Sequence, residues 1–482
     1  MGILNIQPGN PETRKPGNPE TRKPGNPETR KPGNPETRKP GNPETRSVYG
    51  LSQQWLVRDG VVIPSAVVLS HDEQYGRLAE LTPDALSVAV VGGDPCFDRM
   101  RASIAHRARY RAVLGAHSDT TVVAVSSTWG SNSLLGRHLD LIGDLLAELS
   151  IDEHLVAAIL HPNTWFAHGP LQIRHWLSEY LRAGLRLVPP AVGWQHTIVA
   201  ADVVLGDHGA VTGYSAAIGR PTLLATFPDH DVAPGSVIEA LGKSAPHVDF
   251  RQSLHEQLHR AIGDYEPDQF HTVRELTSSI PDESARTLRQ VFYQLMDLPE
   301  PDRAAVVRPF DPSELTIEDG IACAALVSAE LSSDASVHVT RWPADVTSHH
   351  SALHEAADIH LVVRSDHPQR DLLTHAAILT HQNPPNDMHA DQALAEIMAN
   401  YPACRLAVVA NSERTGVLRH RNGDTATAEV VDGPGDVALA GSAIHAWLAS
   451  GRPWPTLPDK IVITHGPFRT SIQLSVTVPM VT

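Results

Sequence analysis

The chain has 482 residues, of which 41% are hydrophobic and 20% charged, and its formal net charge is -16. A chain of this length holds two or three domains with sizeable cores. Its acidic surface repels phosphate backbones, so we expect no nucleic-acid partner. The three cysteines, at positions 96, 323 and 404, lie too far apart for a zinc or disulfide signature, which fits a reducing compartment.

The sequence shows no membrane span and no targeting segment. No apolar run approaches the roughly 20 residues that a membrane helix needs. Residues 1–5 (MGILN) lack the basic and apolar regions of a signal peptide. We therefore expect a cytoplasmic protein with at most peripheral membrane association, and the oligomeric state stays open.

Residues 8–46 repeat the octad Pro-Gly-Asn-Pro-Glu-Thr-Arg-Lys, restarting at Pro16, Pro24, Pro32 and Pro40. Each copy carries prolines and no apolar side chain, so nothing can pack, and we expect residues 1–50 to be a disordered, polyproline-II-like tail. Two origins stay open for it. One is a selected flexible tail, and the other is translated repetitive DNA, because the unit CCCGGAAA read through all three frames encodes this octad.

Two buried strands, each followed by a helix, open the folded part. The strands are expected over residues 61–69 and 87–91, and the helices over 70–81 and 99–114. Ser70 and Glu73 form a capping box for the first helix. The string Gly92-Gly93-Asp94-Pro95 predicts a turn, and Gly115 predicts the end of the second helix.

The alternation of strands and helices then becomes regular. Strands are expected at 121–126, 155–160, 185–188, 203–205 and 222–226, with helices between them at 134–149, 170–183, 194–200 and 211–218. This pattern predicts an α/β fold with a Rossmann-like, doubly wound parallel sheet. Ligands of such sheets bind beyond the carboxyl ends of the strands. Here those ends are the polar segments 126–128, 161–163 and 207–209.

The rest of the chain is harder to interpret. Residues 249–298 are helical and charged, and 309–482 predict a second α/β lobe of unknown role, with strands at 337–340, 360–363, 407–409 and 460–464. We therefore expect a tail (1–50), a Rossmann-like nucleotide-binding domain with the remnant of a preceding domain (51–305), and a C-terminal α/β region (309–482).

Histidine is frequent, with 27 copies, many of them between residues 349 and 389. His350 and His354 could share one helix face, but no HExxH motif accompanies them. We expect solvated histidines, no metal site and no cofactor.

Four motifs in residues 64–227 resemble those of the CDP-glycerol glycerophosphotransferases. These are GT-B-type enzymes that polymerise teichoic-acid backbones and are related in fold to the UDP-GlcNAc 2-epimerases. In chain order the motifs are GGDPCFD at 92–98, RAVLG at 111–115 followed by 122–129, LHP at 160–162, and DVVLGDHGAV at 202–211 ending in GRP at 219–221. The resemblance implies the donor-binding half of a metal-independent GT-B transferase.

The resemblance also implies a site for a nucleotide-diphosphate-linked donor at the strand ends. Backbone amides at the helix start Gly209-Ala210-Val211 would bind the pyrophosphate, because a helix N-terminus favours anions. His161 would be the catalytic residue, as acid/base or phosphate ligand. The predicted donor-binding residues are Ser126, Ser127, Thr128, Asp207, His208, Gly209, Ala210 and Val211.

Departures from the family pattern lead us to expect weak binding without turnover. The paired serines of the family are Gly209 and Ala210 here, and its acidic helix residue falls at Tyr214. The family's acceptor domain, which carries its other functional histidine, does not precede the motifs. His168-Gly169-Pro170 resembles the context of that histidine, but it follows His161 and so lies in the donor-binding half.

Three functions stay open. The favoured one is a donor-binding protein derived from a glycerophospho- or glycosyltransferase. The second is an active transferase whose N-terminus is mis-assigned. The third, a translational GTPase of the initiation factor 2 type, is disfavoured because it needs a P-loop, and the candidate Gly242-Lys243-Ser244 has Val237 in place of the first glycine.

Overall fold

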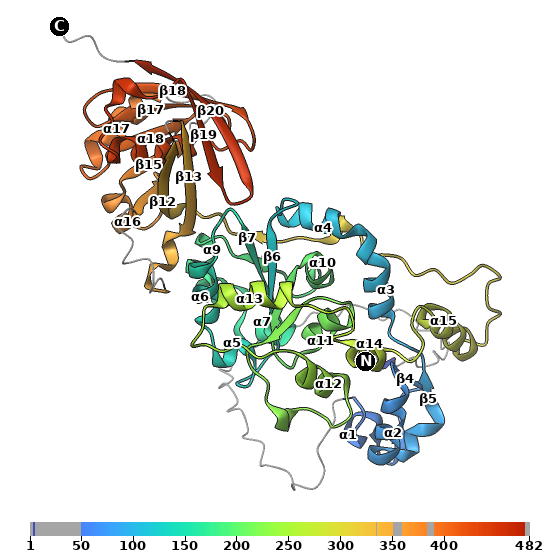
Figure 1. Cartoon of the computed structure of the whole chain (residues 1–482). Helices are drawn as coiled ribbons and strands as arrows, with labels where there is room; N and C mark the ends of the chain where they lie inside the picture. The colour runs from blue at the N-terminus through green and yellow to red at the C-terminus, as the bar shows by residue number, and fades with distance from the viewer. Residues whose placement is uncertain (1–2, 5–49, 334, 350–358, 383–389, 478–482) are drawn as a thin grey trace, which may run out of the picture. The chain divides into compact units, whose positions relative to one another are not determined.

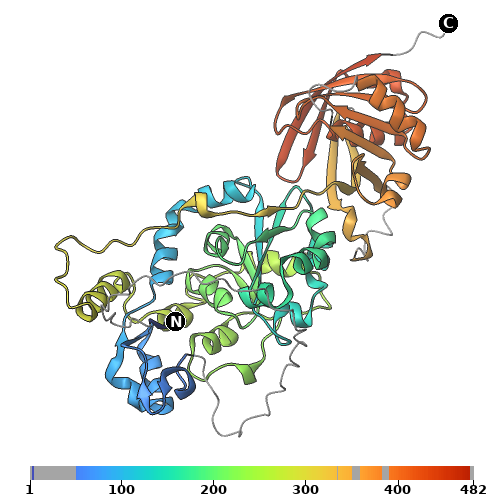
Figure 2. The same ribbon diagram turned by 180° about the vertical axis from the view of Figure 1, so that it is seen from behind.

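A computed structural model describes residues 3–4, 50–333, 335–349, 359–382 and 390–477 (Figures 1 and 2). The chain divides into two compact units, Met1–Pro95 with Ser278–Val306, and Cys96–Thr277 with Val307–Thr482. Most of the predicted tail lies outside the described residues, as do His350 and His354.

The second unit contains a six-stranded sheet. Its order is β10-β9-β6-β7-β8-β11. The strands are β6 (Thr121–Ser127), β7 (His154–Leu160), β8 (Arg186–Val188), β9 (Val203–Gly206), β10 (Thr222–Leu224) and β11 (Glu318–Asp319). All neighbours pair in parallel except β11, which runs antiparallel to β8. The predicted parallel sheet is thus present.

Both faces of this sheet are buried, as the alternation along β6 shows. Val122 and Ala124 enter one core, whereas Val123 and Val125 enter the other. The first core includes residues of α4 (Arg107–Leu114), α10 (Trp194–Ala200), α11 (Ala210–Ala217) and α14 (His271–Thr277). The second includes residues of α6 (Leu141–Glu148), α8 (Pro170–Trp176), α9 (Ser178–Arg182) and α13 (Leu254–Gly263). Figure 1 shows helices on both sides of β6 and β7, the doubly wound arrangement that continuous apolar strands predict.

Some predicted helices are shorter than expected. Residues 134–149 form α5 (Leu134–Arg137) and α6, because the backbone leaves the helical region at His138, whose ring stacks on Phe250 with centroids 4.3 Å apart. Gly115 ends α4 in the left-handed region, as predicted, with φ 81°. Within the described residues, no helix combines the length and apolar character needed to cross a membrane.

The first unit has a separate small sheet. In it β4 (Ala66–Leu69) pairs in parallel with β5 (Ala89–Val91) and antiparallel with β1 (Ile3–Leu4). The predicted strand 61–69 is therefore two strands, β3 (Val61–Val62) and β4, with Pro64 between them. The capping box is also wrong in detail: the N-cap of α2 (Asp72–Leu81) is His71, whose Nδ1 accepts from the Glu73 amide at 3.0 Å.

The C-terminal region differs most from its prediction. Within the described residues, nine strands close into a barrel in the order β12-β13-β19-β20-β18-β17-β16-β15-β14. Its strands are β12 (Ala324–Ser333), β13 (Ser336–Pro343), β14 (Ile359–Arg364), β15 (Ile378–Gln382), β16 (Leu406–Ala410), β17 (Thr415–His420), β18 (Thr425–Asp432), β19 (Lys460–His465) and β20 (Phe468–Thr477). Helix α18 (Leu439–Ala449) packs against β12, β13, β16 and β19. The four strands predicted here are present, but the sheet is a closed barrel.

Local sequence explains the antiparallel part of this barrel. In β18 buried residues alternate with exposed or half-buried ones, and the inward residues Ala426, Ala428 and Val430 join the barrel core. Asn422-Gly423, with Gly423 at φ 103°, connects β17 to β18. An Asn-Gly pair between alternating segments is a strong hairpin signal.

Candidate functional site

The carboxyl ends of β9, β6 and β7 lie side by side because these strands are parallel neighbours. Two hydrogen bonds connect the loops that follow them. The Thr128 amide donates to Asp207 Oδ2 at 2.9 Å, and the His161 amide donates to the Ser127 carbonyl at 3.0 Å. The three predicted segments thus come together at one edge of the sheet.

Asp207 holds these loops in place. Its buried carboxylate accepts from the amides of Thr128 (2.9 Å), Leu134 (2.8 Å) and Gly209 (3.0 Å). Burial raises the pKa of Asp207 above its ordinary value, although these amide bonds and the nearby His208 act in the opposite direction. Because the oxygens serve the chain's own backbone, Asp207 is a positioning residue here.

The two serines predicted to bind the donor are inside the protein. Ser126 is 2% exposed and Ser127 is 4% exposed. The Ser127 hydroxyl donates to the Thr128 carbonyl at 3.0 Å and accepts from the Leu135 amide at 3.1 Å. Ser127 therefore shapes the loop after β6, and the half-buried Thr128 is the residue of this group that reaches a cavity.

The start of α11 is open to an anion. Gly209 is its N-cap and makes no side-chain capping bond, Ala210 is exposed, and Val211 is half-buried. The first amides of a helix have no intrahelical partner, and the dipole favours negative charge there. A Cβ on Gly209 would lie 2.9 Å from Asp207 Oδ1 and 3.1 Å from Thr128 Cβ. Glycine thus allows the loop after β6 to approach this helix start.

Two histidines belong to the loops around this helix start. His161 is the N-cap of α7 (Pro162–His168), and its Nδ1 accepts from the Asn163 amide at 3.1 Å. Burial lowers the pKa of His161, while Asp207 acts to raise it. The neutral ring then carries its proton on Nε2, which makes it a hydrogen-bond donor for an anionic oxygen. His208 is half-buried, and its Nδ1 has no hydrogen-bond partner within the described structure.

A cavity of about 460 Å³ adjoins the loops after β6 and β7. Its walls combine aromatic rings with hydroxyl groups, among them those of Thr128, Trp129, Ser131, Thr164 and Trp176. The Trp129 and His161 ring centroids are 6.4 Å apart. Both tryptophans are exposed, 57% for Trp129 and 42% for Trp176. Neither Trp129 nor Trp176 was assigned to the site from the sequence, although a tryptophan directly after a strand end was a usable signal.

His168 also lines this cavity, where its ring packs edge-on against Trp176 with centroids 4.7 Å apart. Tyr214, which stands where the family has an acid, lies in α11 with its ring 5.7 Å from that of Trp194. The structure therefore puts a packed aromatic ring at the position of the acid.

The candidate P-loop has the wrong structure for phosphate binding. Gly242, Lys243 and Ser244 form the last turn of α12 (Val237–Ser244), and Lys243 pairs with Glu239 at 3.0 Å. A P-loop is the segment between a strand and the start of a helix. The structure gives no support to the GTPase alternative.

No family profile and no curated protein matches this sequence. Among solved structures, the chain is similar to the wall teichoic acid polymerase TagF, with 16% identity and a TM-score of 0.35 over 48% of this chain and 57% of that one. It is also similar to UDP-GlcNAc 2-epimerase from Neisseria meningitidis, with 14% identity and a TM-score of 0.31 over 49% of this chain and 62% of that one. The same enzyme from Methanocaldococcus jannaschii gives 13% identity and a TM-score of 0.33 over 48% and 62%.

The resemblance to glycerophosphotransferases and epimerases, drawn from the motifs, thus recurs in the comparison with solved structures. It covers about half of this chain, and the chain spans only 57% of the length of the TagF structure. At this level the similarity says nothing of activity or ligands, so a function has to be argued from the chain's own residues.

Proposed function

We propose that the carboxyl edge of the six-stranded sheet binds a nucleotide-diphosphate-linked donor, as a GT-B-like protein derived from a glycerophospho- or glycosyltransferase. The observation that carries this proposal is the open start of α11, held beside His161 and the cavity by the hydrogen bonds of Asp207. Neutral backbone donors and a helix dipole bind a pyrophosphate without a cation or a metal ion.

Each part of such a ligand has a matching group. The pyrophosphate meets the amides of Ala210 and Val211 and the Nε2 proton of His161, while the Gly209 amide stays bonded to Asp207. The nucleobase fits the cavity, where the Trp129 and Trp176 rings offer flat apolar surfaces and Thr128 offers a hydroxyl. Ser126, Ser127 and Asp207 are buried, and we assign them the role of holding the loops in position without contacting the ligand.

We further propose that binding is weak and turnover slow or absent. Gly209 and Ala210 bring no hydroxyl to the helix start, and each missing charge-assisted hydrogen bond is worth about 1.5–3 kcal/mol. Tyr214 supplies no carboxylate in this helix. The alternative, an active transferase that uses His161, differs from this proposal in turnover alone.

Titration calorimetry of the full chain with CDP, UDP, CMP and UMP tests binding. We expect each diphosphate to bind about tenfold more tightly than its monophosphate, because the second phosphate adds at least one charge-assisted bond. Equal affinities would remove the assigned role of the helix start. No binding of any nucleotide would overturn the proposed function.

The variant Ala210→Pro tests the helix start itself. Proline is tolerated at the first helical position, and Gly209, at φ -77° and ψ 156°, already has the extended backbone that precedes proline. The substitution removes one amide donor and should weaken CDP binding about tenfold without moving the urea midpoint. Unchanged affinity would show that this amide does not contact the ligand.

Release of nucleotide from CDP-glycerol and from UDP-sugars tests turnover. We expect none from the purified chain. Turnover that disappears in His161→Ala would establish the active transferase instead. Turnover that persists in His161→Ala would point to a contaminating enzyme, which a repeat with a second purification step removes.

A further inference from the structure

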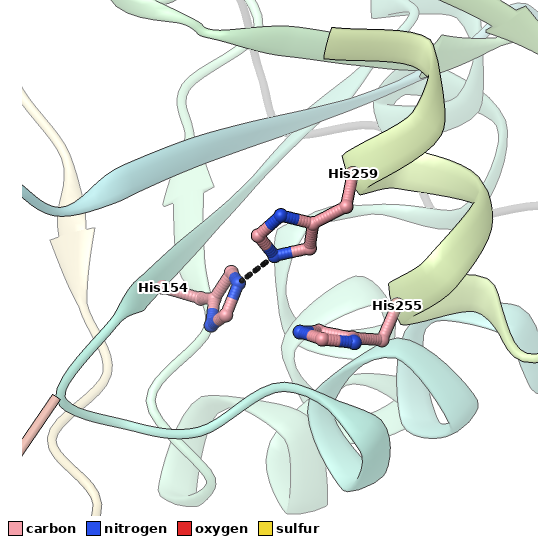
Figure 3. Close-up of side chains that lie close together, drawn as sticks. All are labelled: His154, His255 and His259. Atoms are coloured by element: carbon pink, nitrogen blue, oxygen red, sulfur yellow. Dashed lines mark hydrogen bonds between the residues drawn. The ribbon is translucent and has the colours of Figure 1, made fainter. Parts of the chain in front are cut away.

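Three histidines meet at the opposite edge of the six-stranded sheet (Figure 3). His154 is the first residue of β7, so it lies at the amino end of the strand whose carboxyl end leads to His161. His255 and His259 are one turn apart on α13 and therefore share a face of that helix. Figure 3 shows both rings turned toward the ring of His154.

The spacing of the three rings suits a metal ion. One ligand nitrogen from each residue lies within 4.8 Å of the others, and the Nε2 atoms of His154 and His259 are 3.4 Å apart. Zinc–nitrogen bonds of about 2.0–2.1 Å in a tetrahedral site place two ligand nitrogens about 3.3 Å apart. The pair His154–His259 already has this separation. His255 is half-buried and His259 is exposed. Their rings therefore have room to rotate until all three ligand nitrogens have this separation.

The surroundings hold the ligands in place and favour a cation. Ser253 caps α13, and Glu148 Oε2 accepts both from the Ser253 hydroxyl at 2.6 Å and from the His255 amide at 3.0 Å. Glu153 and Glu148 also act electrostatically on His255. The helix that carries two of the rings is thus anchored, and carboxylates add negative charge beside it.

We propose that His154, His255 and His259 bind one divalent transition-metal ion, such as Zn²⁺ or Ni²⁺, with water completing the coordination. Three imidazole nitrogens suit these ions, whereas Mg²⁺ and Ca²⁺ prefer oxygen ligands. The ion joins β7 to α13 and thereby stabilises the face of the sheet that the second core covers. The site is independent of the nucleotide site, since the two lie at opposite ends of β7.

The test uses the full chain after removal of metals with EDTA. Titration with Co²⁺, followed by visible absorption, and calorimetry with Zn²⁺ should each show one equivalent that binds at least tenfold more tightly in the wild type than in His255→Ala/His259→Ala. His255 is half-buried and His259 is exposed, so the double variant should fold, as circular dichroism in EDTA would check. Mg²⁺ in large excess should not displace the bound ion.

His271→Ala is the matched control, because His271 is an exposed histidine on α14 that pairs with Glu275 at 3.2 Å. It should bind Co²⁺ and Zn²⁺ like the wild type. The proposal is overturned if the double variant titrates like the wild type. It is equally overturned if His271→Ala weakens binding as much as the double variant, since the ion would then be spread over surface histidines.

Discussion

Strand β9 has an aspartate just outside each end, and the two carboxylates have opposite environments. Asp202, at the amino end, accepts from the Val122 amide at 2.8 Å and pairs with Arg107 and Arg111. Burial alone would raise its pKa, but the Val122 amide and the two arginines outweigh burial and lower the pKa. Asp207, at the carboxyl end, is bonded to backbone amides, and burial raises its pKa.

The two edges of the sheet therefore differ in how their carboxylates are satisfied. At the amino edge, the charged side chains form ion pairs with one another. At the carboxyl edge, a carboxylate holds loops through neutral donors, and within the described residues no arginine or lysine hydrogen bonds to it. An anion that binds at this edge therefore depends on amides and the helix dipole, which is consistent with weak binding.

The largest expected effect is at the carboxyl edge. Asp207→Ala leaves the amides of Thr128, Leu134 and Gly209 without their acceptor and should destabilise the protein by about 3 kcal/mol. Urea unfolding measures this loss. Asp140→Ala is the matched control, because Asp140 is exposed and makes no side-chain capping bond, and it should change stability by less than about 0.5 kcal/mol. Equal effects of the two variants would show that Asp207 does not hold the loops.

Asp202→Asn should cost less, about 2 kcal/mol at neutral pH, because Asn keeps one acceptor oxygen but loses the charge that Arg111 and Arg107 pair with. The folded pKa of Asp202 is below its unfolded value of about 3.9, so its contribution is present above that pH and lost as the pH falls through the folded pKa. The gap between wild type and variant should therefore narrow in acid. A constant gap from pH 7 to pH 3 would contradict this assignment.

The pH dependence of the contribution to stability has the opposite sign for Asp207. Its folded pKa is raised, so the part of its contribution that depends on protonation is complete below the unfolded pKa and is lost as the pH rises through the folded value, whereas the three amide bonds remain. The two aspartates on one strand thus act on stability in opposite directions across the acid range. Guanidinium midpoints measured from pH 3 to pH 7 on both single variants would separate the contributions.

Donor affinity gives a smaller effect that tests the carboxyl edge directly. Ala210→Ser adds a hydroxyl at the exposed first position of α11 and should tighten CDP binding about tenfold, which corresponds to about 1.4 kcal/mol. Gly209→Ser should not, because its Cβ would come within 2.9 Å of Asp207 Oδ1 and 3.1 Å of Thr128 Cβ. Calorimetry on both variants decides. A gain in Gly209→Ser alone would mean that the loop after β6 moves away from α11.

The carboxyl edge was predictable because its signals are local. Strands buried on both faces are short apolar runs, such as Leu155–Leu160, and each ends in polar residues that topology must bring together. What local sequence did not show is how those residues are used. Asp207 matched a donor-binding motif, yet a buried carboxylate has to be satisfied, and the nearest donors are the amides of its own loops.

The closure of the barrel and the histidine cluster at the amino edge depend on contacts between segments that are far apart in the sequence. The barrel closes where β12 pairs with β14, for example Leu326 with Leu361. The histidine cluster joins the start of β7 to a helix far along the chain. Counting histidines drew attention to residues 349–389, whereas spatial neighbours define a metal site.

The smallest expected effect concerns that cluster. In EDTA, His259→Ala should change the free energy of unfolding by less than about 0.5 kcal/mol, because an exposed ring is removed and it makes a single 3.4 Å contact with His154 Nε2. With Zn²⁺ in excess, only the wild type should gain stability, since a ligand that binds the folded state alone stabilises it by mass action. Thermal melts with and without Zn²⁺ measure both the effect of the substitution in EDTA and the stabilisation by Zn²⁺. A large loss of stability in EDTA would mean that the three rings stabilise the amino edge by their own packing. Side-chain contacts alone would then hold that edge together, which would increase its difference from the carboxyl edge, where backbone amides do so.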